Sequence, residues 1–207
     1  SQSEIIGAVQ AATDPRDVLV GAAGSLPGDL HKLWRVRDPL GYHIEYAFSC
    51  MGYEIAAGLG VARADSSRTP VVMMGDGSYL MMHTELVTAV AEGLKFIVVL
   101  VQNHGFASIG HLSEDIGSQR FGTQYRFKDQ TGNNFENGEK LPVDLAANAA
   151  SLGINVIDIQ QTPSAIADLH EAVKGAKQSA TSTLIHINSD PMLYSPGGEG
   201  WWDVPIA

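Results

Sequence analysis

The segment from Val71 to Phe106 constrains the fold of this chain more than any other stretch. It contains two short apolar runs, Val71–Met74 and Phe96–Val101, separated by residues with the spacing of a helix. Two buried strands joined by a helix form a crossover, and the strands of such a unit run parallel in one sheet. The pattern therefore predicts an α/β fold, a doubly wound and mostly parallel sheet with helices on both faces.

Each of these two predicted strands ends in a polar side chain. Asp76 follows the first strand, between Gly75 and Gly77, and Asn103 follows the second, 103 − 76 = 27 positions later. The carboxyl ends of parallel strands meet at one edge of the sheet, where α/β folds bind ligands. Because Gly77 lies at the start of a helix, free N–H groups there can hold an anion, while Asp76 and Asn103 offer oxygens to Mg²⁺. The pair predicts a site for a metal-bound phosphate.

The composition narrows the class of protein and of partner. The length of 207 residues suffices for one domain with a sizeable core, which we predict to span residues 1–207. The net charge of −10 argues against nucleic acid and anionic membranes as partners. Cys50 is the only cysteine and the first residues lack a signal-peptide pattern, which favours the cytoplasm. The longest apolar run, residues 96–101, is too short to span a bilayer.

The remaining pattern predicts further elements. These are helices over residues 3–12 (with Ser3 as N-cap), 51–64, 79–91, 144–152 and 162–179 (with Pro163 in the first position), and strands over 17–21, 155–159 and 184–187. The Gly- and Ala-rich helix 51–64 is expected to pack closely against the sheet or another subunit. Residues 103–117 and the long loop 118–140 follow no regular pattern. The tail 190–207, with its two tryptophans, is predicted to dock on this domain or a neighbour.

The polar strand ends also carry a resemblance to a known family. Gly75-Asp76-Gly77-Ser78 followed by Gln102-Asn103-His104-Gly105-Phe106 resembles the signature of the thiamin-diphosphate-dependent enzymes, Gly-Asp-Gly followed by Asn-Asn. The resemblance implies that Asp76, Asn103 and the carbonyl of Gly105 hold Mg²⁺ against the cofactor's diphosphate. It covers nearly the whole chain, as the diphosphate-binding domain of the decarboxylase and acetolactate synthase group. Gln102 is a departure, because the family usually has its first Asn there.

Two further stretches resemble cofactor-binding segments of this family. Ser49-Cys50-Met51-Gly52-Tyr53 is similar to the segment whose bulky residue wedges beneath the cofactor. This implies that Met51 is the wedge and that the Ser49 carbonyl lies near the aminopyrimidine, although the family more often has Gly there. Gly24-Ser25-Leu26 resembles the loop that contacts the diphosphate from the other side. The implied cofactor-binding residues are Gly24, Ser25, Leu26, Ser49, Met51, Gly75, Asp76, Gly77, Ser78, Asn103, Gly105 and Phe106.

The resemblance implies an enzyme that cleaves a C–C bond beside a carbonyl, with the cofactor as electron sink. The runs that begin at His43, Gly75 and Asn103, and the Trp-Trp-Asp-Val-Pro run at Trp201, are closest to a hydrolase branch that opens a cyclic diketone in inositol breakdown. Acetolactate synthase-like enzymes and 2-oxoacid decarboxylases remain alternatives, because they share the cofactor residues. A non-catalytic Mg²⁺-phosphate or nucleotide-binding module, or a purely structural subunit, is a further alternative, although no P-loop motif is present.

The resemblance also implies that part of the active site lies outside this chain. The family activates its cofactor with a Glu from a pyrimidine-binding domain, and no stretch of this chain resembles that domain. Glu85 and Glu92 lie within a predicted helix and are poor substitutes. We expect the pyrimidine-binding domain of the same or a neighbouring subunit to complete the site in a homodimer or homotetramer, and this chain alone to be inactive. The catalytic residues are unassigned, with His104 and His111 as candidates for contact with substrate.

Overall fold

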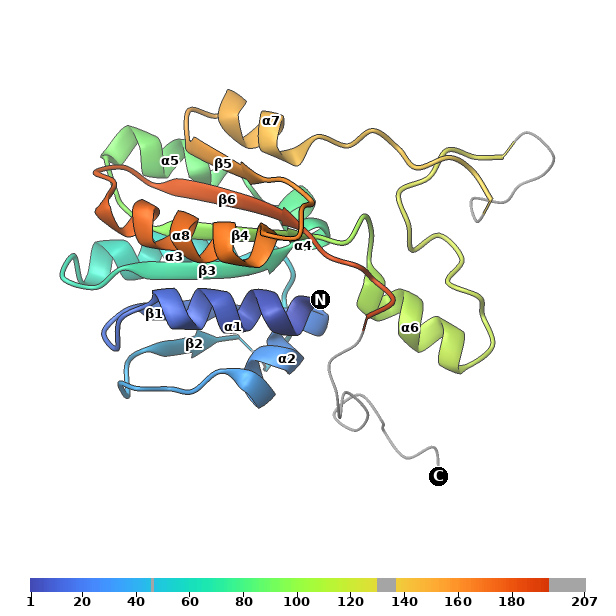
Figure 1. Ribbon diagram of the computed structural model, residues 1–207, viewed down its shortest axis with the longest axis horizontal. Helices are drawn as coiled ribbons and strands as arrows, with labels where there is room; N and C mark the ends of the chain where they lie inside the picture. Colours follow the sequence, from blue (N-terminus) through green and yellow to red (C-terminus); the bar gives the residue numbers. More distant parts are fainter. Residues whose placement is uncertain (46, 130–136, 194–207) are drawn as a thin grey trace.

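A computed structural model describes residues 1–45, 47–129 and 137–193 of the chain. In these residues a six-stranded sheet lies between two layers of helices (Figure 1). The elements are α1 Gln2–Ala12, β1 Val18–Gly21, α2 Ser25–Leu33, β2 Tyr42–Ile44, α3 Tyr53–Ala64, β3 Pro70–Gly75, α4 Asp76–Met81, α5 Glu85–Glu92, β4 Ile97–Gln102, α6 Ala107–Asp115, α7 Leu145–Ser151, β5 Asn155–Ile159, α8 Ala165–Gln178 and β6 Thr183–Asn188.

The sheet confirms the predicted fold class. Its strand order is β2-β1-β3-β4-β6-β5, and every neighbouring pair is parallel. The predicted crossover joins β3 to β4, whose register places Gly75 opposite Val101. Asp76 and Asn103 therefore follow neighbouring strands at the same carboxyl edge of the sheet.

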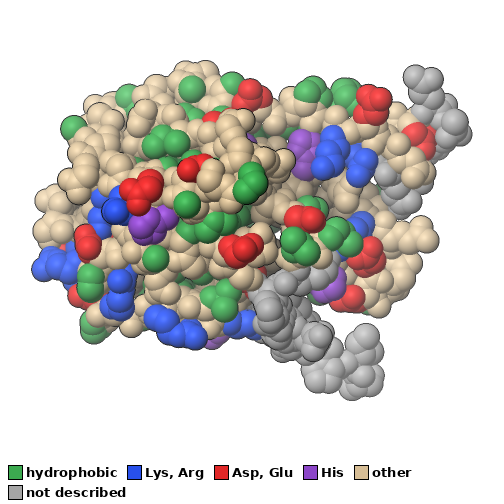
Figure 2. Space-filling model, viewed as in Figure 1, with side chains coloured by type: hydrophobic (Ala, Val, Ile, Leu, Met, Phe, Trp, Pro, Cys, Tyr) green, Lys and Arg blue, Asp and Glu red, His purple; other side chains and the backbone are tan. Residues whose placement is uncertain are grey.

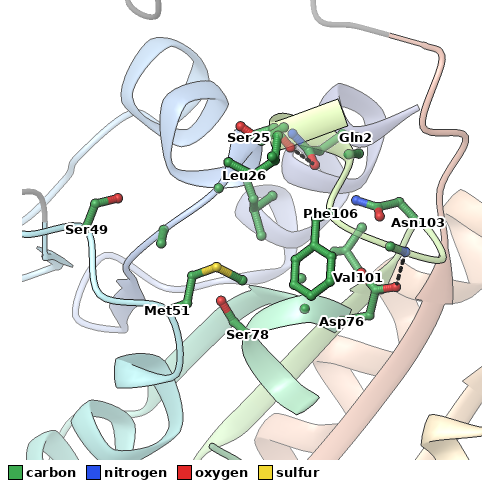
Figure 3. Close-up of a pocket in the computed structure, with 18 residues that line it drawn as sticks. Gln2, Ser25, Leu26, Ser49, Met51, Asp76, Ser78, Val101, Asn103 and Phe106 are labelled. Carbon is green, nitrogen blue, oxygen red and sulfur yellow. Dashed lines mark hydrogen bonds between the residues drawn. The ribbon is translucent and has the colours of Figure 1, made fainter. Parts of the chain in front are cut away.

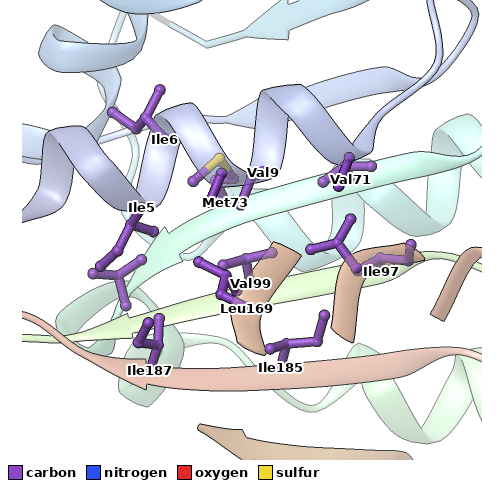
Figure 4. Close-up of a cluster of buried hydrophobic side chains, with 14 of the residues drawn as sticks. Ile5, Ile6, Val9, Val71, Met73, Ile97, Val99, Leu169, Ile185 and Ile187 are labelled. Carbon is purple, nitrogen blue, oxygen red and sulfur yellow. The ribbon is translucent and has the colours of Figure 1, made fainter. Parts of the chain in front are cut away.

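Alternate side chains of the strands form two hydrophobic cores. Val71 and Met73 face the layer of α1, α2 and α8, where Ile5, Val9 and Leu169 cover the sheet (Figure 4). The intervening residues of β3 face the opposite layer, which contains α3, α5 and α7. A strand that is buried on both faces needs apolar residues at every position, which explains the unbroken apolar runs in the sequence.

Helix α3 confirms the expectation that its small residues allow close packing. Gly58 faces β3 so closely that a Cβ atom there would lie 2.4 Å from Cγ2 of Val72. Ala56 and Gly60 are exposed on the outer side of the same helix. The sheet is therefore the surface against which the smooth inner face of α3 packs.

The single helix predicted over residues 79–91 is wrong, because α4 and α5 are separate. Met82 interrupts the helix with an extended backbone, at φ −150° and ψ 85°. Helix α4 starts directly after β3 and buries Tyr79, whereas α5 turns so that Leu86 and Ala89 reach the sheet. One straight helix could not place both sets of side chains in the core. Gly93 ends α5 in the left-handed conformation, at φ 61°, as predicted.

Helix α6 and strand β2 were not predicted as such. Only Gly110 of α6 is buried, so its sequence shows no apolar stripe that would predict a helix. Strand β2 lies at the edge of the sheet and its side chains are only partly buried. Two predicted helix starts are also displaced, since Ser1 rather than Ser3 caps α1 in a capping box, and α8 starts after Ser164 rather than at Pro163.

The long loop folds back on the segment that follows β4. The N–H of Phe106 donates to the Thr123 carbonyl at 2.8 Å, and the N–H of Tyr125 donates to the His104 carbonyl at 3.0 Å. With α6, this loop extends beyond the carboxyl edge of the sheet (Figure 1). Trp201 of the predicted docking tail lies outside the described residues, together with the tryptophan next to it.

The charges on the surface and the lengths of the helices bear on the partners predicted from composition. The face shown in Figure 2 presents acidic and basic side chains in both halves of the molecule. Within the described residues, no helix combines the length and the apolar character that crossing a membrane requires.

The packing of α3 predicts opposite effects for two similar substitutions. Gly58→Ala forces a methyl group against Val72 and should lower the free energy of unfolding by about 1–3 kcal/mol. Gly60→Ala meets nothing within 4 Å and should raise it by up to about 1 kcal/mol, because alanine favours the helix. Urea denaturation of the two variants measures both changes. Equal effects of the two substitutions would contradict the packing of α3 on β3.

Candidate functional site

A pocket lies at the carboxyl edge of the sheet, where β1, β3 and β4 end (Figure 3). All twelve residues predicted to bind a cofactor line it. The structure adds Gln2, Ala23, Val101, Ala107, Ser108 and Ile109 to this lining. The cavity volume of about 200 Å³ is smaller than the ~300–1,000 Å³ typical of small-molecule sites. The described residues therefore enclose only part of a cofactor-sized ligand.

Asp76 is the central charged group of this pocket. It is the first residue of α4, immediately after β3, and none of its surface is exposed. Its Oδ2 accepts a hydrogen bond from the Gly105 N–H at 3.0 Å, whereas its Oδ1 is buried without a partner. Burial raises the pKa of Asp76 to about 6, although backbone N–H groups, that of Gly105 foremost, partly oppose the shift.

Asn103 supplies a second oxygen of the same kind. It follows β4, and its Oδ1 is also buried without a hydrogen-bond partner. Buried oxygens without partners are costly and rare, so two of them at neighbouring strand ends indicate a missing ligand. A cation bound between Asp76 and Asn103 would satisfy both.

The set of donors identifies the kind of cation that fits. Among the described residues, no group of three or more His, Cys, Asp or Glu side chains could hold a metal ion. A cation here would need oxygens from the backbone and from its own ligand in addition to Asp76 and Asn103. Mg²⁺ binds in this way, through one or two side chains together with phosphate oxygens.

The pocket also offers backbone N–H groups, at the starts of α2 and α4. Gly24 precedes α2 with φ 98°, a conformation that favours glycine, and no side chain caps this helix. The first N–H groups of α2 and of α4, at Ser25 and Gly77, have no carbonyl partner within their helices. Such N–H groups can donate hydrogen bonds to an anion. The Ser25 hydroxyl lies beside them and donates to Gln2 Oε1 at 3.3 Å.

Met51 and Phe106 form the apolar floor. A Cβ atom at Gly77 would lie 2.8 Å from the Phe106 ring and 3.1 Å from Cε of Met51, so only glycine leaves room for both. The Met51 side chain projects into the pocket, whereas Ser49 stands apart at the rim (Figure 3). Ser49 is exposed and has φ 51°. The floor is therefore apolar and closely packed below the polar groups that could hold a charged ligand.

The structure does not bring His104 and His111 into this pocket. His104 lines a second, polar cavity, with Arg126 and Lys140 on its wall. The His111 ring lies on α6, where its Nε2 is 3.6 Å from Oδ2 of Asp115. Neither histidine lines the pocket around Asp76, and their predicted contact with substrate stays a prediction.

Glu54 is a buried group that the sequence reasoning passed over. It lies in α3 with no exposed surface, and its Oε2 accepts from the Gly52 N–H at 2.9 Å, next to Met51. Burial raises the pKa of Glu54, and hydrogen bonds from its own backbone N–H, and then from the Ser78 side chain, partly oppose the shift. An acidic residue within the apolar pattern 51–64 was the available signal. Glu54 braces the start of α3 behind the pocket.

Comparison with protein families gives one match that covers most of the chain. Residues 22–187 match the family model described as thiamine pyrophosphate enzyme, C-terminal TPP binding domain, where thiamine pyrophosphate is thiamin diphosphate. Two curated relatives, from Bacillus cereus (strain ZK / E33L) and Bacillus anthracis, are named 3D-(3,5/4)-trihydroxycyclohexane-1,2-dione hydrolase. Both are 41% identical to this chain over all 207 residues. The chain spans 31% of their length.

Solved structures share the fold. Benzoylformate decarboxylase from Polynucleobacter necessarius superposes with a TM-score of 0.73 at 20% identity, over 91% of this chain and 33% of that chain. A thiamine diphosphate-dependent 4-hydroxybenzoylformate decarboxylase from Rhodococcus jostii RHA1 gives 0.73 at 16% identity, over 92% and 32%. At these identities the likeness concerns the fold alone.

The buried carboxyl of Asp76 predicts a pH dependence of stability in the metal-free protein. Its folded-state pKa of about 6 lies above the unfolded value of about 3.9, so the unfolded state ionises first as the pH rises. The folded state should therefore lose about 3 kcal/mol of stability as the pH rises from well below 4 to well above 6, about 2 kcal/mol of it between pH 4 and pH 6, and Asp76→Asn should not show this loss. Urea denaturation of both proteins across this range, without divalent cations, measures the difference. Parallel stability curves would contradict the assignment.

Proposed function

Because the chain belongs to the thiamine pyrophosphate enzymes, as a C-terminal TPP-binding domain, we propose that its pocket holds thiamin diphosphate through Mg²⁺. The observation that carries this proposal is the pair of buried oxygens without partners, on Asp76 and Asn103, at neighbouring strand ends. In this proposal both side chains and the Gly105 carbonyl bind the cation.

The other pocket residues have matching roles in this proposal. The N–H groups at Gly24, Ser25 and Leu26 on one side, and at Gly77 and Ser78 on the other, hold the diphosphate. Met51 supports the cofactor from below, with Phe106 beside it, and the Ser49 carbonyl faces the aminopyrimidine. When bound, thiamin diphosphate supplies a nucleophilic carbon and an electron sink for cleavage of a C–C bond beside a carbonyl. The residues of this chain anchor and orient it.

The group that activates the cofactor comes from elsewhere in this proposal. Asp76 is the only carboxylate among the residues that line the described pocket, and it is committed to the cation. The described cavity is also smaller than sites that enclose a small molecule. A pyrimidine-binding domain of the same or a neighbouring subunit supplies the missing wall and an activating glutamate, in a homodimer or homotetramer. His104 and His111 have no assigned role in catalysis.

The whole protein acts on a cyclic diketone in this proposal. The support is the 41% identity, over all 207 residues, to relatives named 3D-(3,5/4)-trihydroxycyclohexane-1,2-dione hydrolase. The reaction is the hydrolytic opening of that ring to 5-deoxyglucuronate, a step of inositol breakdown in the cytoplasm. The decarboxylases among the structural neighbours do not favour a 2-oxoacid substrate, because their likeness concerns the fold.

Calorimetry of the full-length protein with thiamin diphosphate and Mg²⁺ tests the cofactor site. Asn103→Ala removes one cation ligand and should lower cofactor affinity at least tenfold, roughly the lower bound seen when groups around a bound metal are lost. Asn155→Ala is the matched control, because Asn155 begins β5 at the opposite edge of the sheet. Binding of ATP in preference to thiamin diphosphate would instead favour a nucleotide-binding module.

An assay with two substrates tests the reaction. The full-length enzyme should consume 3D-(3,5/4)-trihydroxycyclohexane-1,2-dione and leave pyruvate unchanged, because the relatives act on the dione. A preparation of residues 1–207 alone should show no turnover, because it lacks the activating glutamate. Decarboxylation of pyruvate at a comparable rate would overturn the substrate, and turnover by the short chain would overturn the divided site.

A further inference from the structure

Gln102 is the last residue of β4 and directly precedes Asn103. It is 4% exposed, and its side-chain amide is engaged at both ends. Its Oε1 lies 2.8 Å from Nε2 of His186, and its Nε2 lies 3.0 Å from Nδ1 of His104. The amide therefore joins the neighbouring strand β6 to the residue that follows Asn103.

The two histidines extend this contact into a chain of polar groups. On one side, Nδ1 of His186 lies 2.7 Å from Oδ1 of Asp158, its register partner on β5. On the other side, Nε2 of His104 lies 2.8 Å from the carbonyl of Leu141, the residue directly after the long loop. The chain thus crosses three strands at the carboxyl edge of the sheet. We call Asp158, His186, Gln102 and His104 the polar chain.

The geometry assigns the hydrogen-bond donors of the polar chain. His104 donates from Nε2 to the Leu141 carbonyl, so its Nδ1 accepts from the Gln102 amide. His186 faces two acceptors, Asp158 Oδ1 and Gln102 Oε1, and both contacts are hydrogen bonds when both ring nitrogens carry a proton. Every buried polar atom of Gln102 is then satisfied.

The position of the polar chain is unusual for a protein core. Two residues earlier in each strand, Leu184 and Leu100 occupy the same face of β6 and β4 and belong to the hydrophobic core. At His186 and Gln102 this apolar pattern gives way to buried polar side chains. Apolar side chains of similar volume could stand there without loss of stability. Such an arrangement is informative where it meets a functional site, and the polar chain ends at residues 103–105.

Residues 103–105, which we call the anchor turn, adopt a strained and tightly bounded conformation. His104 has φ 67°, in the left-handed region that residues with a side chain disfavour. A Cβ atom at Gly105 would lie 2.2 Å from the Thr123 carbonyl oxygen, so the long loop presses against the turn. The hydrogen bonds at both nitrogens of the His104 ring hold this conformation in place.

We propose that Gln102, braced by His186, is a positioning residue that holds the anchor turn in the conformation that binds the cation. The side-chain oxygen of Asn103 and the Gly105 N–H contact with Asp76 both depend on the backbone of this turn. Gln102 holds the ring of His104, the residue between Asn103 and Gly105, and so sets the distance from Asn103 to Asp76. The inference rests on the proposed Mg²⁺–thiamin diphosphate site.

Gln102→Met tests the proposal, because methionine keeps the length and volume of glutamine and removes its contacts with His186 and His104, together with a long hydrogen bond to the Val143 carbonyl at 3.4 Å. Calorimetry of the full-length protein with thiamin diphosphate and Mg²⁺ should show a dissociation constant raised about tenfold, the effect of losing one or two hydrogen bonds. Ser182→Ala is the matched control, because Ser182 joins β4 to β6 at the opposite edge through Phe96 N and Leu94 O. It should lower thermal stability and leave cofactor affinity unchanged.

His186→Leu provides a second measurement with a smaller perturbation. It removes the brace and keeps the Gln102–His104 contact, so the dissociation constant should rise by less than in Gln102→Met. If Gln102→Met does not fold, His186→Leu decides alone. Unchanged cofactor affinity in a folded variant, with stability lowered as in Ser182→Ala, would overturn the proposal and leave the polar chain structural.

Asp76→Asn separates this inference from the proposed function. If Asp76→Asn loses cofactor binding while Gln102→Met retains it, the cofactor site stands and the positioning role is wrong. If the unaltered protein binds no thiamin diphosphate with Mg²⁺, or Asp76→Asn binds it equally well, the cofactor site is wrong and the inference falls with it.

Discussion

The parallel pairing of β3 with β4 is the interaction on which the candidate site depends. Its register sets Gly75 opposite Val101, so Asp76 and Asn103 emerge side by side although a whole crossover separates them in the chain. The two hydrophobic cores hold this register from both faces, because a slip of one residue would exchange the side chains that face α1 and α3. Packing of the sheet thus fixes the geometry at its edge.

This geometry is unfavourable without a ligand. Asp76 is a buried carboxyl with a raised pKa, Asn103 has a buried oxygen without a partner, and His104 adopts a left-handed backbone. Strain and unsatisfied groups of this kind cluster at functional sites, where the surrounding structure enforces them. Here the enforcing parts are the strands below, the long loop against Gly105 and the polar chain beside it.

Sequence reasoning located the pocket well and its surroundings poorly. The predicted lining residues converge because most of them lie at the end of a strand or the start of a helix. The polar strand ends at Asp76 and Asn103 indicated the site, and the resemblance to a known family implied the other residues. The contact of Gln102 with His186 was not found, because the pairing of β4 with β6 joins segments whose proximity no local pattern encodes. Glu54 was passed over although its partner Gly52 is two positions away, because only the folded structure shows that its carboxyl is buried. Helix α6 was missed because it buries almost nothing.

The sequence by itself determined the fold class, the crossover and the identity of the residues around the pocket. The fold class and the crossover follow from periodicity, because a strand buried on both faces must be apolar. The residues around the pocket follow from the polar strand ends and from the resemblance of short motifs to a known family. Only the tertiary structure decided that Asp76 and Asn103 each keep an oxygen without a partner, and that Gln102 links β6 to the anchor turn. Burial and hydrogen-bond satisfaction are properties of packed surroundings, and many distant segments set them together.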